Sequence, residues 1–201
     1  MKVKVCGMRE AANIRAVDDL FPDLMGFIFY EKSPRHVSDV PEFLPRHAER
    51  VGVFVDAESE HILSHAREFG LQYVQLHGSE SPELCRMLRS RGLKVIKAFS
   101  ISSPCDVMRA SEFLDCCDMF VFDTKCKSMG GSGRTFDWKF LDAYIGNVPF
   151  LLSGGIGPDT DLGVFSHPML AGYDLNSRFE ISPGLKDVTA LETFINKIRS
   201  L

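Results

Sequence analysis

The feature of this chain that most constrains its fold is a regular alternation between short strand-like runs and helical stretches. Runs rich in β-branched and aromatic residues recur along the whole sequence, and each predicts a strand. The run from Leu24 to Phe29 is apolar at consecutive positions, as expected for a strand covered on both faces of a parallel sheet. The eight predicted strands are Val3–Cys6, Leu24–Tyr30, Val51–Val55, Tyr73–His77, Lys94–Phe99, Met119–Asp123, Pro149–Ser153 and Gly172–Leu175.

The segments between these runs carry signals for helix ends. Ser81-Pro82-Glu83 combines an N-cap residue, a proline at the first helical position and an early acid, and Gly92 suits the helix exit. Gly157-Pro158-Asp159 predicts another helix start of the same kind. The last helix is expected from about Asp187, and its apolar stripe is Val188, Leu191, Ile195 and Ile198.

Strand followed by helix, repeated eight times without a break in composition, is typical of a closed (β/α)8 barrel or of a doubly wound open sheet. No G-x-G-x-x-G motif follows the first strand, whereas glycine-rich turns follow the sixth and seventh. These details favour an α/β protein that is a single-domain (β/α)8 TIM barrel over residues 1–201, close to the lower size limit of that fold.

Charge and composition limit the partners. A net charge of −4 argues against a nucleic-acid partner. The alternating start Met1–Val5 lacks the apolar stretch of a signal peptide or membrane helix, so we expect no membrane partner and a cytoplasmic location. The oligomeric state stays open, with a monomer favoured.

No metal or cofactor is expected. His61 and His65 have the i, i+4 spacing of a helical metal site, but they flank or oppose the apolar stripe formed by Ile62, Ala66 and Phe69, and no further ligands complete a set. The six cysteines, at positions 6, 85, 105, 116, 117 and 126, show no CxxC pairing. Reduced thiols are therefore predicted.

In barrels of this kind the chemistry sits at the carboxyl ends of the strands. Cys6 ends the first strand, and its thiolate is a candidate general base if its pKa falls below about 8.5. Packing as a small hydrophobe is the equal alternative. Asp123 ends the sixth strand after an apolar run, where burial would raise its pKa and make it a general acid, or where it caps the next loop.

Two consecutive strand ends indicate a phosphate site. Gly154 and Gly155 place bare backbone before a predicted helix start, and Asn176 and Ser177 follow the eighth strand. Gly133 lies in a glycine-rich loop with basic residues nearby, although flexible loops often have this composition. Ordinary turns are the alternative reading.

Two further polar residues follow strands. Arg35, held by a preceding proline, could pair with a substrate carboxylate, whereas a surface arginine is the commoner case. His77 follows the fourth strand, where a structural histidine is as plausible as a catalytic one. Both residues are candidates for the mouth of the barrel.

Taken together, these strand ends resemble those of the phosphoribosylanthranilate isomerase family in order and across nearly the whole chain. The resemblance rests on Lys4-Val5-Cys6-Gly7, Ser33-Pro34-Arg35, Gln75-Leu76-His77-Gly78, Phe122-Asp123, Gly130-Gly131-Ser132-Gly133 with Phe136-Asp137-Trp138, and Leu152-Ser153-Gly154-Gly155-Ile156. It implies an Amadori rearrangement in tryptophan biosynthesis, in which N-(5′-phosphoribosyl)anthranilate becomes 1-(o-carboxyphenylamino)-1-deoxyribulose 5-phosphate without a cofactor.

By the same resemblance, Asp123 is the general acid and Cys6 the general base. Arg35 would hold the anthranilate carboxylate, Asp174 would approach the link between ring and sugar, and His77 would support the site. The phosphate would lie against Gly133, Gly154, Gly155, Asn176 and Ser177. Arg178 stands where the family often has glycine, and Ser132 where threonine is common.

Two rival functions remain at this stage. Another phosphosugar barrel, such as the histidine-pathway Amadori isomerase or indole-glycerol-phosphate synthase, would share the phosphate site. Cys6 at the first strand end, where the histidine-pathway enzyme has an aspartate, argues against the first, and the lack of an obvious inward lysine against the second. A catalytically silent phosphosugar-binding module would keep the phosphate site without the chemistry.

Overall fold

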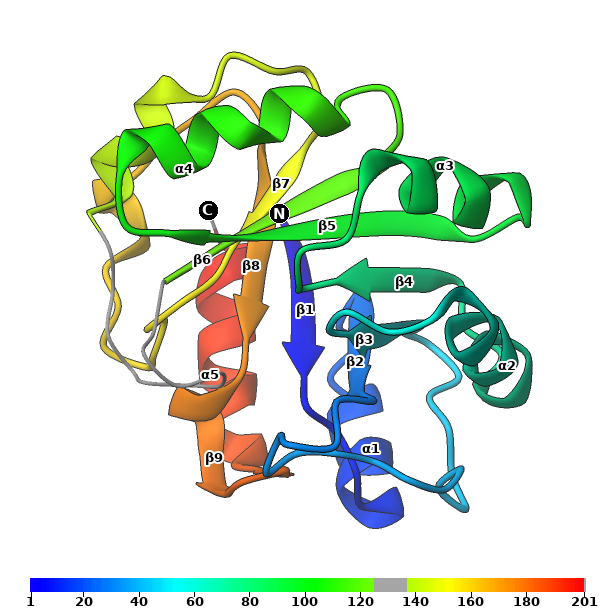
Figure 1. Ribbon diagram of the computed structural model, residues 1–201. Helices are drawn as coiled ribbons and strands as arrows, with labels where there is room; N and C mark the ends of the chain where they lie inside the picture. The colour runs from blue at the N-terminus through cyan, green and yellow to red at the C-terminus, as the bar shows by residue number, and fades with distance from the viewer. Residues whose placement is uncertain (125–136, 201) are drawn as a thin grey trace.

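The computed structural model describes residues 1–124 and 137–200. Eight parallel strands pair in chain order and close into a barrel, because β1 pairs with both β2 and β8 (Figure 1). The strands are β1 (Lys2–Cys6), β2 (Leu24–Ile28), β3 (Glu49–Phe54), β4 (Tyr73–Leu76), β5 (Lys94–Ile101), β6 (Met119–Thr124), β7 (Phe150–Leu152) and β8 (Leu170–Leu175). The predicted barrel is confirmed, and every predicted strand end lies within two residues of the observed one.

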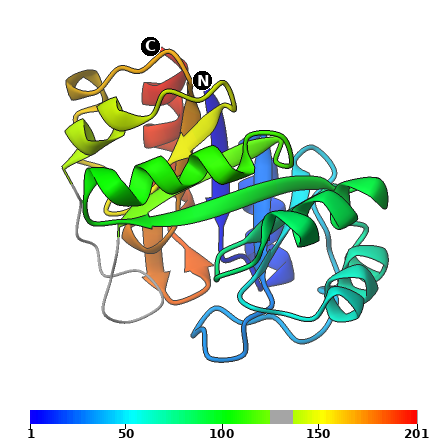
Figure 2. The ribbon, with the colours of Figure 1, turned by 45° about the horizontal axis from the view of Figure 1, so that its top comes forward.

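Helices cover the outside of the barrel (Figures 1 and 2). Two predicted helix starts are confirmed: the Ser81 side chain accepts a hydrogen bond from the Leu84 amide, and Asp187 accepts one from the Ala190 amide. The α-helices are α1 (Ala11–Asp18), α2 (Ser59–Phe69), α3 (Pro82–Ser90), α4 (Pro104–Met108) and α5 (Val188–Arg199).

Short elements complete the fold. The 3-10 helices are η1 (Arg109–Phe113), η2 (Trp138–Ala143), η3 (Leu162–Val164) and η4 (Ser177–Phe179). Beyond β8, the strands β9 (Glu180–Ser182) and β10 (Leu185–Lys186) form a small antiparallel hairpin at the carboxyl end of the barrel (Figure 1). Among the described residues, every helix is too short or too polar to cross a lipid bilayer.

Among the described residues, the expectation of a helix after every strand is wrong after β2 and after β7, and β6 is followed only by the 3-10 helix η2. Residues 29–48 contain no helix between β2 and β3, because prolines at positions 34, 41 and 45 remove backbone donors and restrict the residues before them. Gly157-Pro158-Asp159 starts no α-helix either. The Thr160 amide donates to the Gly157 carbonyl, which closes a turn, and only the three-residue η3 follows.

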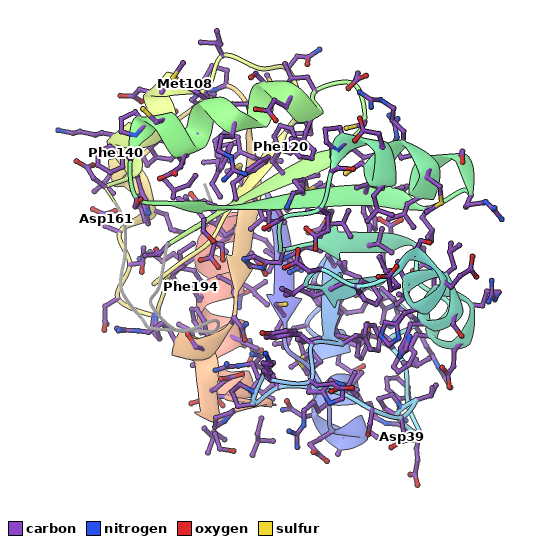
Figure 3. The ribbon with its side chains drawn as sticks, viewed as in Figure 1. Asp39, Met108, Phe120, Phe140, Asp161 and Phe194 are labelled. Carbon is purple, nitrogen blue, oxygen red and sulfur yellow. The ribbon has the colours of Figure 1, made fainter. Side chains whose placement is uncertain are left out.

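Apolar side chains fill two layers of the fold. Inside the barrel, Leu24, Val51, Ile96, Val121 and neighbouring side chains form one buried cluster. A larger cluster fills the space between strands and helices, where Phe120 lies against Phe99 and Phe194 of α5 packs on Phe179 (Figure 3). Buried side chains thus fill the interior of the barrel. The carboxyl ends of the strands therefore remain as the place for a site.

Candidate active site

The mouth of the barrel is organised around a buried ion pair between β1 and β8. Lys4 is fully buried and lies opposite Asp174 in the register of the two strands. Its ammonium nitrogen is 2.9 Å from each carboxylate oxygen of Asp174. Burial raises the pKa of Asp174, and the nearby Lys4 charge opposes this shift. The pair places a fixed positive charge directly beside Cys6, which lies two residues further along β1.

Cys6 is buried at the end of β1, against the backbone of Gly26 on β2. Burial raises the pKa of its thiol, and the positive charges of Lys4 and Lys186 only partly offset this effect. The lowered pKa on which the role of Cys6 as a base was made conditional is therefore not found, because desolvation outweighs both ammonium groups. The position at the mouth, in contrast, is as predicted.

Asp123 ends the buried part of β6 and faces the same opening. Burial raises the pKa of its carboxyl, while hydrogen bonds from the Thr124 amide and the Ser153 side chain and the Lys4 charge work in the opposite direction. Lys4 acts on the pKa of both Cys6 and Asp123, so a single ammonium group lies within electrostatic range of the two candidate catalytic residues. A carboxyl with a raised pKa can donate a proton.

His77 follows β4, and its side chain lies beside Asp123 at the mouth of the barrel. Its Nε2 atom is 3.6 Å from the Asp123 Oδ2 atom, and its Nδ1 atom is 3.4 Å from the Gln75 amide nitrogen. Burial, together with the charges of Lys97 and Lys4, lowers the His77 pKa to about 4. The imidazole is therefore neutral near pH 7 and contacts Asp123 as a dipole rather than as a cation.

Arg35 is buried and paired, so it is not the surface arginine that was the commoner alternative. Its Nε atom lies 2.9 Å from Glu180 Oε1, and its Nη2 atom bonds Glu180 Oε2. Glu180 also accepts from Lys186, whose ammonium bonds Asn176 Oδ1 at 2.7 Å. Burial would raise the Glu180 pKa, but the Arg35 hydrogen bonds and the Lys186 charge lower it. These contacts of Glu180 and Lys186 connect the β9–β10 hairpin to Arg35 at the mouth of the barrel.

The glycines after β7 take the backbone conformation that a close contact requires. Gly154 and Gly155 have φ angles of 85° and 73°, in a region that L side chains rarely adopt. A Cβ on Gly154 would lie 2.5 Å from the Thr124 amide nitrogen and 2.8 Å from Asp123 Oδ1. Because Gly154 has no side chain, the loop after β7 can lie close to the end of β6.

The predicted anion seat before a helix is wrong as it was drawn, since no α-helix follows β7. Gly154 and Gly155 lie instead in the loop between β7 and the 3-10 helix η3, and Asn176 and Ser177 lie at the start of η4. The side chain of Arg178 packs on Gly157 and brings a cation to the same two loops. Gly133, the remaining predicted phosphate contact, lies outside the described residues.

Sequence reasoning missed four residues of this mouth: Lys4, Gln75, Glu180 and Lys186. Lys4 also corrects the expectation that no inward lysine exists, because the Val3-Lys4-Val5-Cys6 alternation puts Lys4 and Cys6 on one face. That alternation was the available signal. Glu180 and Lys186 carry no such signal, because only the turn of the β9 hairpin brings them to Arg35.

The comparisons with known proteins agree with this arrangement. Residues 3–197 match the family described as N-(5′-phosphoribosyl)anthranilate (PRA) isomerase. The Phocaeicola vulgatus protein named N-(5′-phosphoribosyl)anthranilate isomerase is 53% identical over 201 residues, which cover 99% of this chain and 98% of that protein. The protein of the same name from Parabacteroides distasonis is 48% identical, over 98% of this chain and 93% of that protein.

Solved structures give the same result. Phosphoribosyl anthranilate isomerase from Thermotoga maritima superposes with a TM-score of 0.86 at 35% identity and covers 100% of both chains. A phosphoribosyl anthranilate isomerase in complex with reduced 1-(o-carboxyphenylamino)-1-deoxyribulose 5-phosphate superposes with a TM-score of 0.83 at 32% identity, also over 100% of both chains. With its barrel, its strand-end residues and relatives along its full length, this chain belongs to the N-(5′-phosphoribosyl)anthranilate isomerase family.

Proposed function

We propose that this chain catalyses the Amadori rearrangement of N-(5′-phosphoribosyl)anthranilate to 1-(o-carboxyphenylamino)-1-deoxyribulose 5-phosphate, a step of tryptophan biosynthesis, with Asp123 as general acid and Cys6 as general base. The observation that carries these roles is the shared electrostatic environment of the two residues. Cys6 is buried and Asp123 is half-buried, both lie at strand ends, and the Lys4 ammonium influences the pKa of each. The chemistry needs one acid and one base on a single ribose.

The first step opens the sugar. Asp123 donates its proton to the furanose ring oxygen, the bond between that oxygen and C1′ breaks, and the nitrogen lone pair forms a C1′=N double bond. The product is a protonated Schiff base and the Asp123 carboxylate. Burial supports this role, since a raised pKa keeps more of the Asp123 carboxyl protonated near neutral pH. The Thr124 amide, 2.7 Å from Oδ1, then stabilises the carboxylate that forms.

The second step moves a proton from C2′. The Cys6 thiolate takes that proton, the C–H electron pair becomes a C1′=C2′ double bond, and the iminium nitrogen is neutralised. The resulting enolamine tautomerises to the ketone. Burial raises the pKa of Cys6, yet the cationic Schiff base beside it favours the thiolate by direct charge attraction. Ring opening by Asp123 thus assists the base that acts next.

Substrate contacts follow from the same geometry. Glu180 engages Nε and Nη2 of Arg35, so the anthranilate carboxylate reaches Arg35 through Nη1 or by displacing Glu180. Asp174, whose carboxylate is held by Lys4, is assigned to the nitrogen that links ring and sugar. The phosphate is assigned to the backbone at Gly133, Gly154 and Gly155 and to the η4 turn with Asn176 and Ser177. Arg178 adds a cation there.

The experiment that tests this function mixes the purified chain with freshly prepared N-(5′-phosphoribosyl)anthranilate and follows the anthranilate-type fluorescence. We expect the signal to decay much faster than in a protein-free control and the product to be the ribulose phosphate. Decay no faster than the control, with substrate still bound, would leave a phosphosugar-binding module as the function.

A further inference from the structure

Three cysteines that the proposed reaction does not use gather outside the barrel. Cys85 comes from α3, and Cys116 and Cys117 come from the turn between η1 and β6. Their sulfur atoms all lie within 4.8 Å of one another, and all three side chains are buried. The cluster lies between the strands and the outer helices, where α3 packs against β5 (Figures 1 and 2).

The spacing of the sulfurs matches what a metal ion needs. A metal–sulfur bond of about 2.3 Å implies sulfurs about 4.0 Å apart around a three-coordinate ion, so only a small contraction of the cluster is required. Within residues 1–124 and 137–200, no His, Asp or Glu joins these three cysteines as a fourth ligand. Three buried thiolates suit soft metal ions rather than Mg²⁺ or Ca²⁺.

Two salt bridges at the surface join α3, which carries Cys85, to the turn that carries Cys116 and Cys117. Arg86, the residue after Cys85, pairs with Asp115 at 3.0 Å, and Arg89 pairs with Asp118 at 3.3 Å. Asp115 and Asp118 flank the Cys116-Cys117 pair in sequence, so α3 is fastened to the turn on both sides of these two thiols. The Asp118 carboxylate also accepts from the Val95 amide, which anchors the turn to β5. The ligands are therefore held in place before any metal arrives.

Metal binding at this cluster would release protons, because the thiolate and not the thiol is the metal ligand. The affinity of the cluster for a metal ion is therefore expected to rise with pH.

We propose that Cys85, Cys116 and Cys117 form a three-thiolate site for a soft, thiophilic metal ion such as Cu⁺ or Cd²⁺. The site is separate from the catalytic mouth, since Cys116 and Cys117 precede the amino end of β6 while Asp123 lies near its carboxyl end. Packing of the three thiols as small core side chains is the outcome that would overturn the proposal.

The test uses Cd²⁺ as the probe, with the reduced full-length chain in a Cys6→Ser background so that the mouth thiol does not contribute. Titration without oxygen, against a competing chelator, is followed by the ultraviolet charge-transfer absorption of Cd–thiolate bonds. We expect one equivalent to bind, tighter as pH rises, with loss of the band in Cys85→Ser and in Cys117→Ser. The matched control Cys105→Ser, which removes an exposed thiol, should keep it.

A second measurement needs no cluster variant, in case those variants fold poorly. X-ray absorption at the cadmium edge of the bound protein should show three sulfur neighbours. Cd²⁺ at about a hundredfold excess over its Kd should raise Tm by roughly 5–10 °C. No stoichiometric band, a band unchanged in Cys85→Ser, or a coordination shell of nitrogen and oxygen would each contradict the proposal.

Discussion

Both carboxylate oxygens of Asp174 lie 2.9 Å from the ammonium nitrogen of Lys4, and the pair is buried at the mouth of the barrel. Burial removes both groups from water, and each charge is compensated chiefly by the other. Removing one partner of a buried pair typically costs about 3–5 kcal/mol, because the remaining charge stays desolvated and unpaired. This relationship fixes the electrostatic setting of the whole site.

Lys4→Met should therefore destabilise the chain by about 3–5 kcal/mol in urea unfolding and raise the pKa of Cys6 further. The double variant Lys4→Met/Asp174→Asn should recover most of the lost stability, because no charge is left unpaired. It should not recover activity. Recovery of both together would mean that the Lys4 charge has no part in catalysis.

His77→Gln tests the neutral state of the imidazole. Because the His77 pKa is about 4, the group loses its charge below the working range and should contribute no titration between about pH 5 and 8. We expect kcat to fall by well under the roughly 10²-fold typical of losing a general acid or base. The pH profile of kcat/KM should keep its shape, and loss of a limb near pH 6–7 in the variant would contradict this role.

Glu180→Gln tests the ion pair between Glu180 and Arg35. The Glu180 pKa is lowered in the folded chain, so its carboxylate contributes stability that is complete above the unfolded pKa of about 4.3 and is lost as pH falls through the folded value. At pH 7 the variant should be about 3–5 kcal/mol less stable, since Arg35 and Lys186 lose their shared partner. Urea unfolding of both proteins should give stabilities that converge as pH falls through the lowered Glu180 pKa.

Gly154→Ala tests the close contact between the β7 loop and β6. The new Cβ would meet the Thr124 amide at 2.5 Å, and the φ of 85° is strained for alanine. We expect a loss of more than about 1 kcal/mol in stability and a higher KM, with inorganic phosphate becoming a weaker competitive inhibitor. Gly92→Ala is the matched control, because it has a similar positive φ but an empty surrounding space. A normal KM in Gly154→Ala would remove this loop from phosphate binding.

Much of the barrel could be predicted from sequence because buried parallel strands leave unbroken apolar runs, as at Leu24–Ile28. The missing helix between β2 and β3 was also readable, since the prolines of residues 34–45 argue against one. Gly157-Pro158-Asp159 misled because the same residues that start helices also close turns. Local sequence alone does not separate the two outcomes.

The site, too, could be predicted from sequence only in part. Cys6, Asp123 and His77 lie at strand ends, a position that the strand pattern identifies. The Cys6 pKa could not be read from sequence, because its direction depends on how completely the folded barrel removes water from the thiol. The Arg35–Glu180–Lys186 contact and the Cys85, Cys116 and Cys117 cluster join residues distant in the chain, so only the folded structure reveals them.

A monomer remains the predicted oligomeric state of this chain. One solved relative is described as monomers of the dimeric phosphoribosylanthranilate isomerase from Thermotoga maritima, so both forms occur among the relatives of this chain. Sedimentation equilibrium across a range of concentrations would decide it, with a single species of one chain mass expected. A concentration-dependent rise to twice that mass would contradict the prediction.

The most direct test of the central claim is kcat for Cys6→Ser and Asp123→Asn, measured beside the exposed-thiol control Cys105→Ser. We predict losses of roughly 10²–10⁴-fold in each site variant, with circular dichroism spectra and urea midpoints that show an intact barrel, and an unchanged kcat in the control. A near-normal kcat in either folded site variant would contradict the assignment of that residue as the acid or the base.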